Sequence, residues 1–477
     1  MLDLYIIKHH NRLYWNTQCT NVRGFTFDEA KDFACRNQLE DCSFINVEEE
    51  IKKYNLKSEN TSYLSSLITP EEFTFYIWYQ AYSDNHINVD SLPYRILTSE
   101  EYYEKLKLLF ERYCKEITKP AFVYETNFIL EVTDICSQIL KIVKDLIDGH
   151  SDVAEEKLKQ LLQKFISDPF LVSNLNDSYA FRGIGAFEDL RCTGYDDLYA
   201  KTCDSDITLF RVRTKQIDNN DDISLKEHIV HIPYAKKHLA SNMRFSCEGT
   251  PCLYLGATTY VCCCECEWKP KSESAFAAVF IPNEMGKKLK VLNLAISRAL
   301  INGIGNQNNK RKMQCRALQL SMMKLYPLVI ATSFSVSQKE SGIRVEYLVS
   351  QALMKVVKQI GIDGIAYLSM KGVDEFQYPH GVNLALPAFD ISPEQQYSEY
   401  CHAFDMSFPI ELNSSIIKLA VTKKSYINDI YQPIDVEGLE SFSSKIETDG
   451  KRVIYNATDY SKYDDFLCSL NKEKIKI

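Results

Sequence analysis

An arginine, a tyrosine and a glutamate that could together act on a glycosidic bond lie close together in this chain. The segment from Met243 to Gly256 contains Arg244, a Gly-x-Pro turn at Gly249 and then Tyr254, and Glu265 follows eleven residues after that tyrosine. The pattern predicts a turn, a short strand and a helix, which would project the three side chains into one small space. We expect a cleft for an anionic, glycosidic ligand, because guanidinium groups bind oxyanions and a carboxylate stabilises positive charge on a sugar.

Two further segments could complete this site. Leu209 to Arg213 is an apolar strand pattern that carries Arg211, and Asp363 to Ser369 is a strand pattern that ends on a serine. Both are typical of strands in the interior of a sheet.

Taken in order, these segments resemble the RES family, which is named after its arginine, glutamate and serine. The match extends over roughly residues 205 to 390. The chain departs from the usual pattern at Leu368, where proline is common, and in the long span between Glu265 and Ser369. The matched segments are Phe210-Arg211, Arg244 to Ser246, Gly249 to Tyr254, Glu265, Ser350-Gln351, Asp363 to Ser369 and Asn383 to Leu386.

The resemblance implies an α+β fold with a mixed sheet, similar to the ADP-ribosyltransferase fold. It also implies degradation of NAD by cleavage of the nicotinamide–ribose bond, with inorganic phosphate or water as the acceptor. NAD is then a substrate, no further cofactor or metal is expected, and the protein is a toxin or defence effector that an antitoxin or regulatory protein could silence.

The roles of individual residues follow from the same resemblance. Glu265 would stabilise the positive charge that builds on the ribose, and the arginines would bind pyrophosphate or an attacking phosphate. Tyr254 would stack on nicotinamide or ribose, and Ser369 would orient the substrate through a hydrogen bond. We therefore expect a catalytic set of Glu265, Arg211, Tyr254 and Ser369 and a substrate-binding set of Arg211, Arg244, Ser350 and Gln351.

Other interpretations stay open. Arginines at strand ends often form ion pairs, Tyr254 could pack in a core, and Ser369 or Ser350 could merely cap backbone amides. The same site could serve a mono-ADP-ribosyltransferase that modifies a macromolecule, and a RES-like scaffold could also belong to an interaction protein without enzymatic activity.

Composition is that of a soluble globular protein with more than one domain. The chain has 477 residues, 45% hydrophobic and 25% charged, and a net charge of -9, which argues against a general nucleic-acid binder. Neither a membrane-spanning run nor a signal-peptide pattern is evident, so we expect a cytoplasmic protein.

Sixteen cysteines raise the question of a metal site. Cys263 and Cys266 form one Cys-x-x-Cys pair, but a structural zinc site usually needs a second pair. On a helix that carries Glu265, these cysteines more simply fill apolar space. Cys19, Cys35 and Cys42 with the nearby His9 and His10 fit no standard ligand spacing, and disulfides are not expected in the cytoplasm.

Caps and periodicity predict four regions: an uncertain opening over residues 1–64, a helical bundle over 65–197, the RES domain over 198–395 and an extension over 396–477. In the opening region, Thr26 could begin a helix that continues through Arg36. The bundle looks similar to HEPN regions. No arginine precedes any of the nine histidines by the four to six residues of a HEPN nuclease, so we expect no ribonuclease activity. Its amphipathic helices instead favour a homo-oligomer.

Within these regions the patterns predict particular elements. We expect helices that begin at Thr69-Pro70 and at Thr98-Ser99, and further helices over 127–147, 151–165 and 312–326. We expect strands over 277–281, 290–294 and 327–330.

Overall fold

The computed structural model describes the chain in segments that form two compact units. One unit comprises residues 1–86 with 117–126, and the other comprises 87–116 with 127–477. The described residues are 5–9, 12–14, 25–46, 87–90, 92–118, 126–182, 207–216, 226–269, 272–298, 300–301, 312–337, 344–371, 380–412, 445–448, 451–454 and 459–475.

Within its described residues, the first unit is a small three-stranded antiparallel sheet with one helix. The strand order is β2-β1-β3, and α1 covers a core of Ile7, Phe25, Ala30 and Ala34. Thr26 begins α1 with a capping box, since its side chain accepts a hydrogen bond from Glu29 N and the Glu29 carboxylate accepts one from Thr26 N. This confirms the predicted helix, which ends at Arg36. The elements are β1 Tyr5–His9, β2 Arg12–Tyr14, α1 Phe27–Arg36 and β3 Ser43–Asn46.

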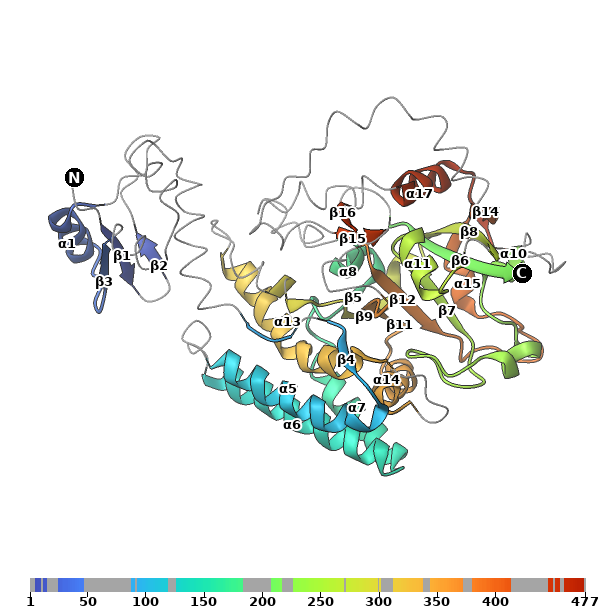
Figure 1. Cartoon of the computed structure of the whole chain (residues 1–477), viewed down its shortest axis with the longest axis horizontal. Helices are drawn as coiled ribbons and strands as arrows, with labels where there is room; N and C mark the ends of the chain where they lie inside the picture. Colours follow the sequence, from blue (N-terminus) through green and yellow to red (C-terminus); the bar gives the residue numbers. More distant parts are fainter. Residues whose placement is uncertain are drawn as a thin grey trace. The chain divides into compact units, whose positions relative to one another are not determined.

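The second unit is built on a large mixed sheet, which confirms the α+β class. Its strand order is β17-β13-β8-β6-β7-β12-β11-β9-β5, with β14 paired to β8; β11 and β9 run parallel and the other pairs antiparallel. In Figure 1 the labelled strands of this sheet run from β8 and β6 on the right through β7, β12 and β11 to β9 and β5. The strands are β5 Val172–Asn174, β6 Leu209–Gln216, β7 Cys252–Gly256, β8 Glu273–Pro282, β9 Lys290–Leu294, β11 Gly364–Leu368, β12 Val382–Pro387, β13 Phe404–Met406, β14 Ile410–Glu411 and β17 Glu473–Lys474.

Helices of the second unit lie against this sheet and against one another. The longer ones are α5 Tyr102–Ile117, α6 Thr126–Ile147, α7 Ser151–Gln163, α13 Lys312–Thr332, α14 Leu348–Gln359 and α17 Asp459–Ser469. Short helices are α8 Tyr179–Arg182, α10 Lys226–Ile229, α11 Thr259–Glu265 and α15 Glu399–His402. The 3₁₀ helices are η1 Ser99–Glu101, η2 Leu175–Asp177, η5 Tyr234–Leu239, η6 Gly286–Lys288 and η7 Val345–Tyr347. Two small sheets pair β4 Tyr94–Ile96 with β10 Phe334–Val336 and β15 Lys445–Thr448 with β16 Lys451–Ile454.

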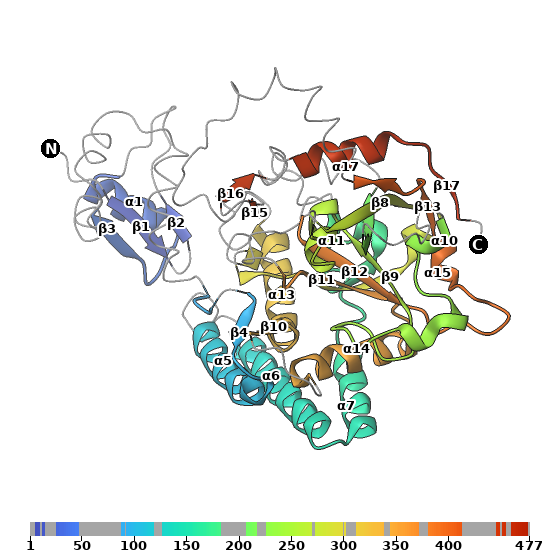
Figure 2. The same cartoon turned by 45° about the vertical axis from the view of Figure 1, so that its right-hand side comes forward.

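The predicted helical bundle shares its compact unit with the sheet. Helices α5 and α6 lie side by side in Figures 1 and 2, and α13 lies next to them. The hydroxyl groups of Tyr102 and Tyr113 on α5 donate to the α13 carbonyls of Ala331 and Met323, each at 2.7 Å. The Lys355 ammonium on α14 lies 2.8 Å from the Glu155 carboxylate on α7. Side-chain contacts thus join this helical region directly to the elements around the sheet.

Most predicted elements are confirmed, and one is wrong. Helices at 126–147 and 151–163 and strands at 273–282 and 290–294 match the expectation closely. Pro327 to Ile330, predicted as a strand, instead continues α13 to Thr332. All four residues are almost fully buried, and a short apolar run in a core cannot be assigned from periodicity alone.

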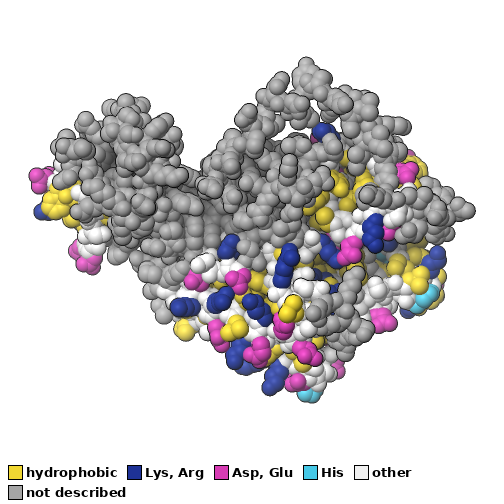
Figure 3. All heavy atoms as spheres, in the orientation of Figure 1, with side chains coloured by type: hydrophobic (Ala, Val, Ile, Leu, Met, Phe, Trp, Pro, Cys, Tyr) yellow, Lys and Arg dark blue, Asp and Glu magenta, His cyan; other side chains and the backbone are white. Residues whose placement is uncertain are grey.

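Several predicted features lie outside the described residues. These are the helix start at Thr69-Pro70 and the residues Cys19 and His10 that were considered as metal ligands. No described helix combines the length and apolar character needed to cross a bilayer. On the face shown in Figure 3, basic and acidic side chains of the described residues are interspersed.

Gly256 at the end of β7 lets α11 approach the sheet closely. A Cβ atom at Gly256 would lie 2.6 Å from Cys262 Sγ and 2.6 Å from Val261 Cγ1, both on α11. Contacts that short force one element to move, so glycine sets the distance between β7 and the helix that ends at Glu265.

We predict that Gly256→Ala lowers the free energy of unfolding by about 1–3 kcal/mol, because the added methyl group overlaps α11. Adding Cys262→Ala should recover part of this loss, since it removes one of the two overlapping atoms. Chemical denaturation of the two single variants and the double variant measures the effect. If the losses of unfolding free energy in the two single variants simply add in the double variant, the close packing of β7 and α11 is contradicted.

Candidate functional site

A cleft with a volume of about 980 Å³ opens where β6 and β7 meet. Within the described residues these strands pair at one position, Phe210 opposite Gly256. The cleft is lined by residues that follow this pair on β6 and precede it on β7, and also by residues of α11 and of the segment after β11. It therefore lies along the middle of the sheet, where side chains from several strands can reach it.

The strand register places five residues on one face of the sheet. Asn383 on β12 lies opposite both Gly256 on β7 and Tyr367 on β11. Residues directly opposite in antiparallel strands share a face, as do residues two apart along a strand. Tyr254 and Ser369 therefore point to the same side as Asn383. Helix α11 covers this side, since its Cys262 contacts the Gly256 position.

Helix α11 is fixed at its N-terminal end. Thr258 caps its N-terminus by accepting a hydrogen bond from Val261 N at 3.2 Å, and the Thr258 hydroxyl donates to the His380 carbonyl at 2.8 Å. Asp464 on α17 accepts from Thr259 N at 3.1 Å and from the Thr259 hydroxyl at 2.5 Å. These contacts fix the helix whose last residue is Glu265.

Two donors from two strands hold the Glu265 carboxylate. The Ser369 hydroxyl donates to Glu265 Oε1 at 2.7 Å, and Asn383 Nδ2 donates to the same oxygen at 2.8 Å. Glu265 lines the cleft. The structure thus brings the side chains of Glu265 and Ser369 into direct contact. Both donors use Oε1, and within the described residues no donor bonds to Oε2, which leaves that oxygen for a ligand.

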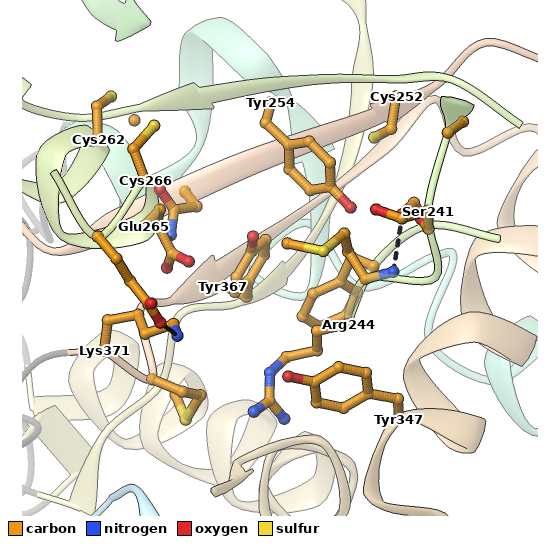
Figure 4. Close-up of a pocket in the computed structure, with 18 of the residues that line it drawn as sticks. Ser241, Arg244, Cys252, Tyr254, Cys262, Glu265, Cys266, Tyr347, Tyr367 and Lys371 are labelled. Atoms are coloured by element: carbon orange, nitrogen blue, oxygen red, sulfur yellow. Dashed lines mark hydrogen bonds and ion pairs between the residues drawn. The ribbon is translucent and has the colours of Figure 1, made fainter. Parts of the chain in front are cut away.

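Two tyrosines line the same cleft as this carboxylate. Figure 4 shows Tyr254 from β7 and Tyr367 from β11 pointing into the cavity that Glu265 lines. Burial raises the pKa of the Tyr254 hydroxyl well above its usual value, and burial with the Glu265 charge does the same for Tyr367. Both hydroxyl groups therefore stay protonated at neutral pH. Tyr367 also packs on Phe245, with ring centroids 4.1 Å apart.

Arg244 is anchored by backbone carbonyls and an aromatic ring. Its guanidinium donates to Thr332 O at 2.7 Å and to Phe334 O, and it lies over the Tyr347 ring at 4.7 Å from the centroid. Burial lowers the pKa of Arg244, whereas the nearby Glu265 charge raises it. The charges of Arg244 and Glu265 therefore lie close enough to interact (Figure 4).

Arg211 is buried on β6, with 7% of its surface exposed. Its Nη1 donates to the Tyr254 carbonyl at 2.6 Å, which joins β6 to β7, and its buried Nε has no hydrogen-bond partner within the described part of the chain. Arg213, two residues along the same strand, donates from Nη2 to Val230 O at 3.0 Å. Among the described residues, no carboxylate forms an ion pair with either guanidinium.

Ser350 and Gln351, predicted to bind substrate, do not line the cleft. Ser350 is fully buried in the first turn of α14. Gln351 Nε2 donates to the Met243 carbonyl at 3.1 Å, so this side chain holds the loop that carries Arg244. The structure thus separates these two residues from the four predicted residues that do line the cleft, which are Arg211, Arg244, Tyr254 and Glu265. Ser369 reaches the site through its hydrogen bond to Glu265.

Sequence patterns did not single out Arg344 and Tyr347, which also line the cleft. The Arg344 guanidinium lies 4.0 Å from the Tyr347 ring centroid, on a ring that Arg244 also contacts. Arg344 Nε donates at 2.9 Å to the buried Glu346 carboxylate, which in turn accepts from Ser99 of η1 at 2.9 Å. No motif marked these residues, because the contact that brings Tyr347 to Arg244 joins segments that are distant in sequence.

The cysteines around Glu265 contact the sheet. Cys262 Sγ and Cys266 Sγ donate to the β6 carbonyls of Phe210 and Val212 at 3.2 and 3.4 Å. Burial raises the pKa of both thiols, so they stay protonated. Among the described residues, no group of three or more histidine, cysteine, aspartate or glutamate side chains is arranged to hold a metal ion.

Comparison with known proteins gives one partial similarity. The chain is 29% identical over 257 residues to a protein of Bacillus subtilis (strain 168) named "Putative toxin YopC", and the match covers 52% of this chain and 51% of that protein. The chain thus spans about half the length of the curated relative that it matches. No family model matches the chain, and no solved structure matches it.

A double-mutant cycle tests the contact between Asn383 and Glu265. We predict that Asn383→Leu and Glu265→Gln show a coupling energy of about 0.5–3 kcal/mol in unfolding free energy, because the amide donates to the carboxylate. The control pair of Asn383→Leu and Glu284→Gln should be additive within about 0.5 kcal/mol, since Glu284 is exposed and bonds to Lys287. A coupling no larger than that of the control pair would argue against this contact.

Proposed function

We propose that this protein degrades NAD by cleaving the bond between nicotinamide and ribose, with phosphate or water as acceptor. One observation carries the proposal: Glu265 is held at one oxygen by Ser369 and Asn383, in a cleft that also contains buried arginines and protonated tyrosines. A fixed carboxylate beside anion-binding groups suits a substrate that combines a glycosidic bond with a pyrophosphate.

In the proposed reaction, the C–N bond to nicotinamide breaks and its electron pair leaves with the pyridine nitrogen, which becomes neutral. Positive charge builds on the ribose, and the Glu265 carboxylate stabilises it. An oxygen of water or of phosphate then bonds to the same ribose carbon, and a proton passes to solvent. The products are nicotinamide and ADP-ribose or its phosphate ester.

The remaining side chains suit binding rather than bond breaking. Arg244 and Arg211 have carbonyl partners but no carboxylate partner within the described residues, so each retains charge for the phosphates of the substrate. Tyr254 and Tyr367 offer rings for stacking and hydroxyl groups that donate at neutral pH. Both tyrosines point into the cavity that Glu265 lines, and Tyr367 is the nearer of the two to the carboxylate (Figure 4), which suits a ribose bound beside Glu265.

We further propose that this activity serves a toxin, because a protein similar to part of the chain carries that name. NAD loss would harm the cell that contains it, so a toxic role and an NAD-degrading site are compatible. The RES-like pattern in the sequence supports the same combination. A protein partner that blocks the cleft and a homo-oligomeric state remain part of this proposal.

We predict that Glu265→Gln lowers the rate of NAD loss roughly 100-fold or more, because an amide keeps the shape but cannot offset the charge on the ribose. Chromatographic measurement of remaining NAD and released nicotinamide over time tests this. The matched control is Glu284→Gln, which makes the same chemical change at an exposed site and should retain wild-type turnover.

The variant must be shown to be folded, for example by a cooperative thermal transition. A folded Glu265→Gln protein that cleaves NAD at the wild-type rate would remove Glu265 from the proposed mechanism.

A further inference from the structure

Strand β6 presents a second arginine to the cleft. Arg211 and Arg213 lie two positions apart on the strand, so both side chains point to the same side of it. Both residues line the cleft. Arg213 lies outside the pattern that identified Arg211, and neither the proposed mechanism nor the sequence comparison assigns it a role.

Each guanidinium is fixed by one backbone carbonyl and keeps an unused donor. Arg211 donates from Nη1 to Tyr254 O and Arg213 from Nη2 to Val230 O, while the buried Nε atoms of both have no hydrogen-bond partner within the described residues. A buried donor without a partner is costly, and more so when it carries charge. The arrangement thus leaves two fixed, unsatisfied N–H groups on one strand.

The charge of this pair is not balanced by its described surroundings. The groups that act most on Arg211 are thiols, and burial raises the pKa of Cys252, Cys262, Cys266 and Cys401, so they are neutral. The Arg211 charge, together with burial, lowers the pKa of Arg213 to about 9. Two like charges therefore lie together in a mostly neutral environment.

The acidic and basic side chains nearby are already engaged. His231 is neutral, since burial lowers its pKa and its Nε2 accepts from Ser398 N at 2.9 Å. Asp390 accepts from the Ser398 hydroxyl at 2.6 Å and from Glu399 N at 2.8 Å. Asp390 therefore already has hydrogen-bond partners of its own, and an anionic ligand would supply the missing charge at the arginine pair.

We propose that Arg211 and Arg213 form an oxyanion subsite for a phosphoryl group, and that Arg213 determines its affinity. Guanidinium groups bind phosphoryl oxygens through paired N–H donors, and a doubly charged anion would offset the repulsion within the pair. The phosphoryl group could belong to inorganic phosphate or to the dinucleotide. Where turnover is concerned the inference rests on the proposed function, whereas the binding itself can be measured without turnover.

The test measures binding of inorganic phosphate and, separately, of ADP-ribose to the full chain by calorimetry, at constant ionic strength set with chloride. We expect Arg213→Gln to weaken binding of at least one of these ligands about tenfold or more, as for the loss of a hydrogen bond to a charged group. Weakened phosphate binding identifies free phosphate as the occupant, and weakened binding of ADP-ribose alone identifies the dinucleotide. Arg112→Gln, an exposed arginine on α5 paired with Asp90, is the matched control and should bind as the wild type does.

Arg213→Lys is a second variant for the case that Arg213→Gln does not fold. It keeps the charge and loses the paired donors, so binding should still weaken. Wild-type affinity for both ligands in a folded Arg213 variant would overturn the proposal. Loss of phosphate binding in a protein that does not cleave NAD would support the subsite and refute the proposed function.

Discussion

The site depends on a single carboxylate that two strands hold from the same side. Ser369 follows β11 and Asn383 lies on β12, and both donate to one oxygen of Glu265. Glu265 itself ends α11, so the position of this helix on the sheet decides whether the three groups meet. Gly256 allows the close approach, and Asp464 on α17 and Thr258 fix the start of the helix. A residue at the C-terminal end of the chain thereby supports the centre of the site.

The second constraint is the burial of positive charge. Arg211, Arg213 and Arg244 all bind backbone carbonyls and have no ion pair with a carboxylate within the described residues. Buried charges without an opposite charge nearby lower stability, and the anion that we propose to bind there would offset this cost and so stabilise the fold. The Glu265 carboxylate also lies in this cleft, but its charge raises the pKa of Arg244. Its hydrogen-bond donors, Ser369 and Asn383, are neutral. The two ends of the site are thus suited to different parts of one ligand.

Local patterns in the sequence predicted the elements that carry the site. The turn at Gly249, the strand β7, the helix α11 and the strand β11 before Ser369 are each encoded by adjacent residues, and all four are present. Contacts between distant segments were harder to predict. Asn383 is 118 residues from Glu265, and nothing local shows that its amide reaches the carboxylate. Ser350 fitted a helix start, but its side chain points into the core, since a helix turn of about 100° per residue decides which residue faces the cleft.

Identifying the bond that breaks tests the central claim most directly. The full chain is incubated with NAD, with and without inorganic phosphate in water enriched in oxygen-18, and the products are resolved by mass spectrometry. Our account predicts nicotinamide together with ADP-ribose that carries one heavy oxygen, or with the phosphate ester of ADP-ribose when phosphate is present. Cleavage at the pyrophosphate, or intact NAD after incubation with folded protein, would contradict it.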